Sequence, residues 1–186
     1  MKNNKILFID TETGGLDPTT NSLLSVAFVV WENGEFLLSK EVLINDGILN
    51  VSPQALEINK INIAKHSKNA LKSEFAVLEI ESFLNENFNN DEKIILCGHN
   101  IIFDINFFKA FWTKNGRNYN QRFSHRYIDT ASLLFYLSIA NKIPSELTSS
   151  DKAFDYFKIS VNKRHSALGD VIATAELFNK LVHIIS

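Results

Sequence analysis

The stretch KILFIDTETGGLDP (residues 5–18) carries two signals in succession. Its first five residues, KILFI, contain four consecutive apolar side chains, which is typical of a short, fully buried β-strand. Asp10 and Glu12 follow two residues apart, so on an extended strand end their carboxylates point to the same side. Gly14 and Gly15 come next, where the lack of a side chain lets the backbone approach a ligand closely. Two like charges on one side repel unless a cation lies between them, and oxygen ligands suit Mg²⁺ or Mn²⁺. A metal site is therefore one interpretation of this stretch, and a solvated turn is the other.

Further strand and helix signals predict an α/β protein with a mixed sheet. Strands are predicted at 26–31 and 35–44, which flank the hairpin turn Asn33-Gly34, and then at 93–97 and 126–128. Helices are predicted to begin at Pro53 and to cover about 69–88, 101–114, 130–140, 150–158 and 167–184. The chain has 186 residues and shows no repeat or long linker, so we expect one domain over residues 1–186.

The composition excludes several classes of protein. Hydrophobic residues make up 45% and charged residues 22% of the chain, which is wrong for a disordered protein. No apolar run approaches the roughly 18 residues that cross a bilayer, so no membrane partner is expected. The single cysteine, Cys97, excludes an intramolecular disulfide and favours a reducing, cytoplasmic location; we expect it to be a buried packing residue.

Charge is unevenly distributed along the chain. The net charge is −2, which argues against coating duplex nucleic acid by bulk charge. Residues 105–165 nevertheless hold ten basic and four acidic side chains, whereas residues 1–59 hold three basic and eight acidic ones. An anionic ligand beside the basic stretch is one interpretation, and solvated helix faces are the other.

Two later stretches also place acids on apolar helix faces. In CGHNIIFDINFFKAFW (97–112), Asp104 shares a helical stripe with three phenylalanines. That position is costly unless the carboxylate is paired, caps a backbone group or binds a metal. In HSALGDVIATAELF (165–178), Asp170 lies on the inward face of a first helical turn, where the helix dipole supplies only a partial positive charge. His165 precedes that helix in a polar loop, where an exposed histidine without a special role is the alternative.

Together, four acids and one histidine form the set that two-metal hydrolysis requires. In that chemistry two cations about 3.5–4 Å apart stabilise the attacking and leaving oxygens of a displacement at phosphorus. The attacking water also needs a base with a pKa near 7, which histidine supplies. Asp129, by contrast, precedes a helix start and is better explained as its cap.

The order and spacing of the three stretches resemble the motifs of the DEDDh family of 3′→5′ exonucleases, in the ribonuclease-H-like superfamily. The H-x-x-x-x-D spacing of the third stretch is the one that marks the histidine subgroup. Within the family, the pattern is most similar to the proofreading branch related to the epsilon subunit of bacterial DNA polymerase III. The resemblance runs from Ile6 to about Leu181 and implies a three-layer α/β/α fold around a central mixed five-stranded sheet.

The resemblance also implies a role for each matching residue. Asp10 would bridge two ions, Glu12 and Asp170 would complete the first site, and Asp104 would hold the second ion, partly through water. His165 would be the general base. The residues expected to hold the terminal nucleotide, with Leu16 wedged against the last base, are Thr11, Thr13, Gly14, Gly15, Leu16, Asn100 and Phe103.

The expected activity is metal-dependent 3′→5′ exonuclease action on DNA or RNA, with Mg²⁺ or Mn²⁺ as cofactor and nucleoside 5′-monophosphates as products. The expected partner is a single-stranded 3′ end. A catalytically inactive module that binds nucleic acid or a protein partner on the same fold is the alternative. The sequence ends shortly after the third motif, so we expect no tail that would tether a polymerase. Proofreading, repair and RNA trimming therefore all remain open, as does the oligomeric state.

Overall fold

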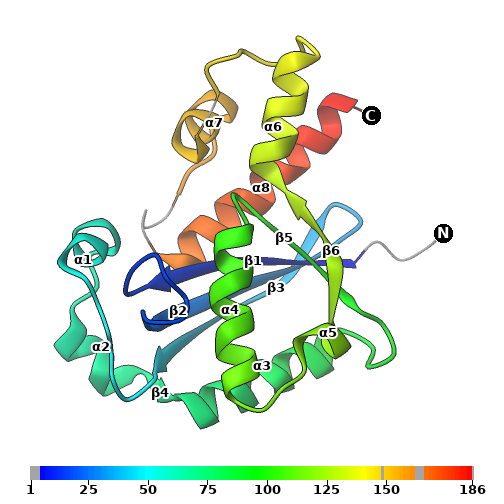
Figure 1. The fold of residues 1–186 in the computed structure, drawn as a ribbon. Helices are drawn as coiled ribbons and strands as arrows, with labels where there is room; N and C mark the ends of the chain where they lie inside the picture. Colours follow the sequence, from blue (N-terminus) through cyan, green and yellow to red (C-terminus); the bar gives the residue numbers. More distant parts are fainter. Residues whose placement is uncertain (1–4, 148, 162–165, 186) are drawn as a thin grey trace.

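Within residues 5–147, 149–161 and 166–185, which the computed structural model describes, six strands form one mixed sheet with helices on both faces (Figure 1). The strand order is β4-β3-β2-β1-β5-β6. The strands are β1 (Lys5–Thr13), β2 (Leu23–Glu32), β3 (Glu35–Asn45), β4 (Leu71–Lys72), β5 (Ile94–Gly98) and β6 (Phe123–Asp129). The α/β/α fold and its mixed sheet are confirmed, but the expected count of five strands was wrong by the two-residue strand β4.

Strand β4 also corrects a helix prediction. The helix expected over 69–88 begins later than predicted, as α3 (Ser73–Asn87), because α2 (Ile63–Asn69) and then β4 precede it. The later start arises because Leu71 and Lys72 pair in parallel with Ile44 and Asn45 of β3. A two-residue pairing of this kind leaves no periodic pattern in the sequence.

The pairing directions bring the motif-bearing strand ends to one edge of the sheet. β2 and β3 form the predicted antiparallel hairpin, with Asn33 and Gly34 at φ 53° and 97° as a tight hairpin turn requires. β1 is parallel to β5, and β5 is parallel to β6. The carboxyl ends of these three strands therefore lie together, at the edge where open α/β sheets bind ligands.

The remaining helices cover the two faces. α4 (Ile102–Lys114) lies with α3 against one face and is followed by α5 (Tyr119–Arg122), while α8 (Ala167–Ile185) covers the other face. α6 (Thr130–Ile139) and α7 (Ser150–Phe157) pack on α8, and α1 (Pro53–Asn59) lies near the end of β1. Within the described residues, no helix combines the length and the apolar character that crossing a membrane would demand.

Strand β1 alternates between the two cores. Leu7 and Ile9 pack with the helices α3 and α4, whereas Ile6 and Phe8 pack with α8. Continuing that alternation to the strand end, Asp10 and Glu12 point toward α8, and Thr11 points toward α4. Cys97 is fully buried in the α8 core, as predicted for a packing residue.

Candidate active site

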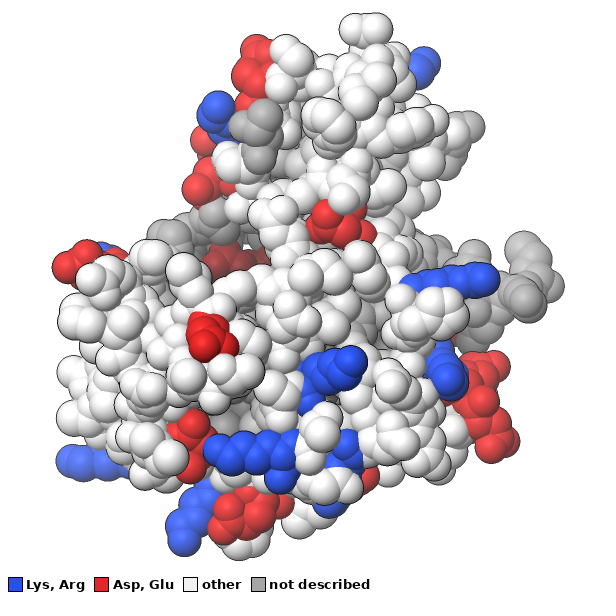
Figure 2. Space-filling model, in the orientation of Figure 1, with Lys and Arg blue, Asp and Glu red and all other residues white. Residues whose placement is uncertain are grey.

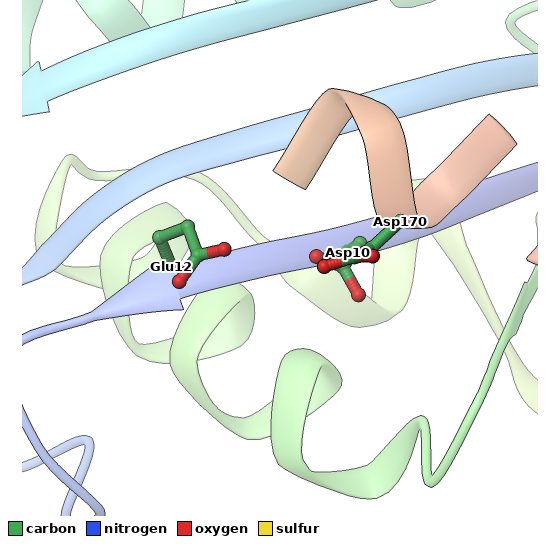
Figure 3. A group of neighbouring side chains, drawn as sticks. All are labelled: Asp10, Glu12 and Asp170. Atoms are coloured by element: carbon green, nitrogen blue, oxygen red, sulfur yellow. The ribbon is translucent and has the colours of Figure 1, made fainter. Parts of the chain in front are cut away.

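Three carboxylates lie together where β1 faces the first turn of α8 (Figure 3). Asp10, Glu12 and Asp170 each offer a carboxylate oxygen, and these oxygens lie within 4.8 Å of one another. β1 supplies the first two, while α8 supplies Asp170. Ser166 fixes the start of that helix, because its hydroxyl accepts from Gly169 N at 3.2 Å and its carbonyl accepts from Asp170 N at 3.0 Å.

Burial and the crowding of negative charge both disfavour the ionised form of Glu12. Burial, and then the charges of Asp170, Asp104 and Glu41, raise the pKa of Glu12 from 4.5 to about 8. A carboxylate that its neighbours keep protonated near neutral pH would ionise readily if a cation joined the cluster. The oxygen-only donor set suits a hard divalent ion, so the residues present fit the metal that the motifs imply.

Asp104 reaches the same end of β1 from the opposite face of the sheet. Its side chain is only 5% exposed, and its Oδ1 accepts a hydrogen bond from Thr11 Oγ1 at 2.7 Å. Burial raises the pKa of Asp104 to about 7, and the hydrogen bond from Thr11 opposes that rise. The helical stripe was thus predicted correctly, and the observed partner of the carboxylate is a threonine hydroxyl.

A cavity of about 500 Å³ opens beside Glu12. The strand end and the following loop form one wall, and Leu16 in that loop is 85% exposed. Of the residues predicted to hold the terminal nucleotide, five line this cavity: Thr11, Thr13, Gly15, Leu16 and Phe103.

Helix α1 forms the opposite wall, which the sequence analysis missed. It contributes Gln54, Ala55, Ile58 and Asn59, and Asn59 Nδ2 donates to the carbonyl of Thr13 at 3.2 Å. The one sequence signal for this wall was the apolar residue Ile58 in a short polar helix. In the structure Ile58 is 64% exposed. Periodicity alone would have assigned that residue to the core.

Both glycines of the first motif are packed against neighbouring protein atoms, and of the two Gly15 lines the cavity. A Cβ on Gly14 would lie 2.2 Å from the carbonyl oxygen of Asn50, and one on Gly15 would lie 2.3 Å from Asn21 Oδ1. The space that they leave is therefore taken by neighbouring protein atoms. Gly14 is buried outside the cavity lining, and the Thr13 hydroxyl donates to the carbonyl of Gly15 at 2.7 Å.

Asn100 also lies apart from the cavity, and the position of His165 is not described. Asn100 is exposed in the turn between β5 and α4 and is not part of the cavity lining. His165, the expected base, lies outside the described residues.

Several cations of the basic stretch have structural partners. Arg117 donates to Glu81 at 2.9 Å, Arg122 donates to carbonyls at the end of α3, and Lys109 lies 5.6 Å from the ring centre of Tyr119. Figure 2 shows a group of lysine and arginine side chains across the lower part of this face of the molecule, where Figure 1 places α3 and α5. For Arg117, Arg122 and Lys109, these structural contacts account for the positive charge.

Comparison with known proteins adds sequence relatives and similar folds. The profile of the RNase T exonuclease family matches residues 7–178. Ribonuclease T of Buchnera aphidicola subsp. Baizongia pistaciae (strain Bp) is 32% identical, over 94% of this chain and 82% of its own length. Ribonuclease T of Photorhabdus laumondii is 29% identical over the same shares.

Solved structures agree on the fold. Exonuclease I from Methylocaldum szegediense matches 96% of this chain with a TM-score of 0.81 at 17% identity. E. coli exonuclease I in complex with a dT13 oligonucleotide matches 95% with a TM-score of 0.79 at 18% identity. This chain spans 40% of the length of either exonuclease I chain, so the likeness concerns the fold of that part.

These relatives are ribonuclease T and exonuclease I, so the epsilon-like branch is the weaker description of this chain. The family profile covers most of the sequence, and the ribonuclease T of Buchnera aphidicola is similar along nearly all of it. The protein therefore belongs to the RNase T exonuclease family, the DEDDh 3′→5′ exonucleases of the ribonuclease-H-like superfamily.

Proposed function

We propose that this protein, as a single exonuclease domain over residues 1–186, removes nucleoside 5′-monophosphates from single-stranded 3′ ends, those of RNA foremost. The position of the 500 Å³ cavity directly beside Glu12 carries the proposal. A terminal nucleotide in that cavity would present its scissile phosphate to the cluster of Asp10, Glu12 and Asp170.

Asp10, Glu12 and Asp170 would hold one Mg²⁺ or Mn²⁺ ion, and Asp10 with Asp104 a second. When bound, the two ions would stabilise the charge that develops on the attacking and leaving oxygens. His165 would take the proton from the attacking water. Thr11 would hold the Asp104 carboxylate by the hydrogen bond described above.

The cavity walls suit an unstacked base. Leu16, Ile58 and Phe103 supply apolar surface, and Gln54 supplies an amide group. Unstacking the last nucleotide costs least where no pairing partner must be displaced, which favours single-stranded ends.

The relatives inform the choice of nucleic acid. The two relatives described above are named ribonuclease T, and the solved exonuclease I structures include complexes with dT13 and dA16 oligonucleotides. We place RNA first because ribonuclease T is the more similar in sequence. A cytoplasmic location fits the single reduced thiol of Cys97.

Matched 5′-labelled RNA and DNA oligonucleotides, single-stranded or blunt duplex, would test the proposal in Mg²⁺ or Mn²⁺. We expect a ladder of shortened products with single-stranded RNA, and no shortening in excess EDTA. Full activity in EDTA would contradict the metal-dependent reaction. An oligonucleotide that stays intact but binds would establish the inactive binding module instead.

A further inference from the structure

One carboxylate that the proposed chemistry does not use joins two segments at the carboxyl edge of the sheet. Asp129 ends β6 and caps α6: its Oδ2 accepts from Ser132 N at 3.1 Å and from Ser132 Oγ at 2.6 Å. Its other oxygen, Oδ1, accepts from the backbone N–H of Asn100 at 2.7 Å. Asp129 therefore connects the start of α6 with the turn between β5 and α4.

That turn has an uncommon backbone conformation. Asn100 has φ 55°, a left-handed value that is uncommon outside glycine, although asparagine adopts it more readily than most other residues. A Cβ on Gly98 would lie 2.9 Å from Ile101 Cγ1 and 3.0 Å from the carbonyl oxygen of Ile9, so the turn is also tightly packed. Thr130, next to Asp129, donates to the carbonyl of Gly98 at 3.1 Å. The junction between β6 and α6 thus holds the turn at two points.

Helix α4 begins directly from this turn. Phe103 N donates to the carbonyl of Asn100 at 3.1 Å, and Ile105 N donates to that of Ile101 at 2.9 Å. Phe103 lines the cavity, and the next residue, Asp104, is a proposed metal ligand. We propose that Asp129 is a positioning residue: through Asn100 it fixes the first turn of α4, and with it Phe103 and Asp104. This inference rests on the proposed exonuclease function of the site.

Capping alone does not account for a carboxylate at this position. An N-cap needs one side-chain oxygen, and serine or asparagine supplies it as well as aspartate does. Burial opposes ionisation of Asp129, but the hydrogen bonds from Ser132, Asn100 and Ile101 outweigh it and keep the pKa of the carboxyl below its ordinary value. Both oxygens therefore accept hydrogen bonds while the group is ionised.

Two substitutions distinguish the capping of α6 by Asp129 from the hydrogen bond that Asp129 accepts from Asn100 N. Asp129→Ser retains an oxygen that can accept from Ser132 N but has no second acceptor for Asn100 N, whereas Asp129→Ala removes both. Asn118→Ala is the matched control, because Asn118 caps α5 just before β6 begins, at the end of that strand opposite Asp129, and its side chain accepts from Gln121 N at 3.3 Å.

The test measures oligonucleotide kinetics, thermal unfolding and amide hydrogen exchange in the full chain. For Asp129→Ser we expect near-wild-type unfolding, a fall in kcat/KM of about tenfold, and a higher Mn²⁺ concentration at half-maximal activity. Exchange should be faster over residues 98–104. Asn118→Ala should leave the kinetics, the Mn²⁺ requirement and that exchange unchanged.

Three outcomes would overturn the inference. The first is wild-type kinetics and hydrogen exchange in Asp129→Ser. The second is a fall in kcat/KM that occurs in Asp129→Ala alone and is matched by its lower stability. The third is an equal fall in kcat/KM in Asn118→Ala. Failure of the proposed function is distinct, because wild-type protein would then shorten no oligonucleotide. Exchange over 98–104 would still report in that case whether Asp129 holds the turn.

Discussion

At the scale of single residues, Thr11 lies between two proposed ligands in the sequence and touches a third in space. Its hydroxyl donates to Asp104, which fixes the carboxylate and favours its ionised form. We expect Thr11→Val to raise the Mg²⁺ or Mn²⁺ concentration needed for half-maximal activity by roughly 10–100-fold, the range seen when a group that orients a metal ligand is removed. Thr11→Ser keeps the hydroxyl and should behave as wild type. Calorimetric Mn²⁺ titrations would check both variants, and equal affinities would show that Asp104 needs no such support.

Asp10 is the residue whose loss should separate activity from stability. Its carboxylate lies within 4.8 Å of ligand atoms of both Glu12 and Asp170, so Asp10→Asn removes a ligand while also reducing repulsion. We expect activity to fall to background and Mg²⁺ to lose most of its stabilising effect. Thermal unfolding in EDTA should occur at the wild-type temperature or above it. A variant that unfolds well below wild type in EDTA would show that Asp10 stabilises the fold by another route.

At the scale of elements, the sequence predicts what depends on local pattern. The pattern of apolar residues predicts the strand that carries Asp10 and the apolar helix face that carries Asp104. The Asn33-Gly34 pair predicts the hairpin. The α1 wall and strand β4 could not be predicted, because each depends on a neighbour distant in the sequence. Asn59 reaches Thr13, and Leu71 pairs with Ile44.

The α1 wall can be tested separately from the acids. Ile58 is 64% exposed and Leu16 is 85% exposed, so truncating either should change the free energy of unfolding little. If both side chains contact the terminal base, truncating either one removes apolar contact with the substrate. The binding free energy then weakens by about 0.8 kcal/mol for each CH₂ group that the base had buried. We expect Ile58→Ala and Leu16→Ala to raise KM for a single-stranded oligonucleotide by roughly tenfold. Leu78→Ala, on the exposed face of α3, is the control and should leave KM unchanged. An unchanged KM in Ile58→Ala would remove α1 from the substrate site.

At the scale of the whole molecule, the net charge of −2 argues against bulk attraction to a long strand, and Arg117 and Arg122 already have structural partners. Each phosphate neutralised on a single strand contributes about −0.7 to the slope of log affinity against log salt. We expect a slope near −2, and faster cutting of single-stranded 3′ ends than of blunt duplex ends. Equal rates together with a slope near −6 would indicate an extended duplex-binding face instead. Binding by the Asp10→Asn variant in EDTA, measured from low to high salt, would give the slope without turnover.

The acidic cluster also makes the stability of the whole molecule depend on pH in a direction that the shifted groups determine. Burial and neighbouring carboxylates raise the pKa of Glu12 from 4.5 to about 8, and burial raises that of Asp104 from 3.8 to about 7. At a pH between the ordinary and the raised pKa of each group, the folded state binds more protons than the unfolded state. The free energy of unfolding therefore falls as pH rises through that range. Each group that is protonated in the folded state and ionised in the unfolded state lowers the free energy of unfolding by up to about 1.4 kcal/mol per pH unit. In EDTA we therefore expect the unfolding temperature to fall from pH 5 to pH 8, and to fall less in Glu12→Gln. Mg²⁺ should stabilise the protein increasingly over the same range, because it binds the ionised carboxylates and not the unfolded chain. An unfolding temperature in EDTA that rises toward pH 8 would mean that the pKa values of Glu12 and Asp104 are not raised in the folded protein.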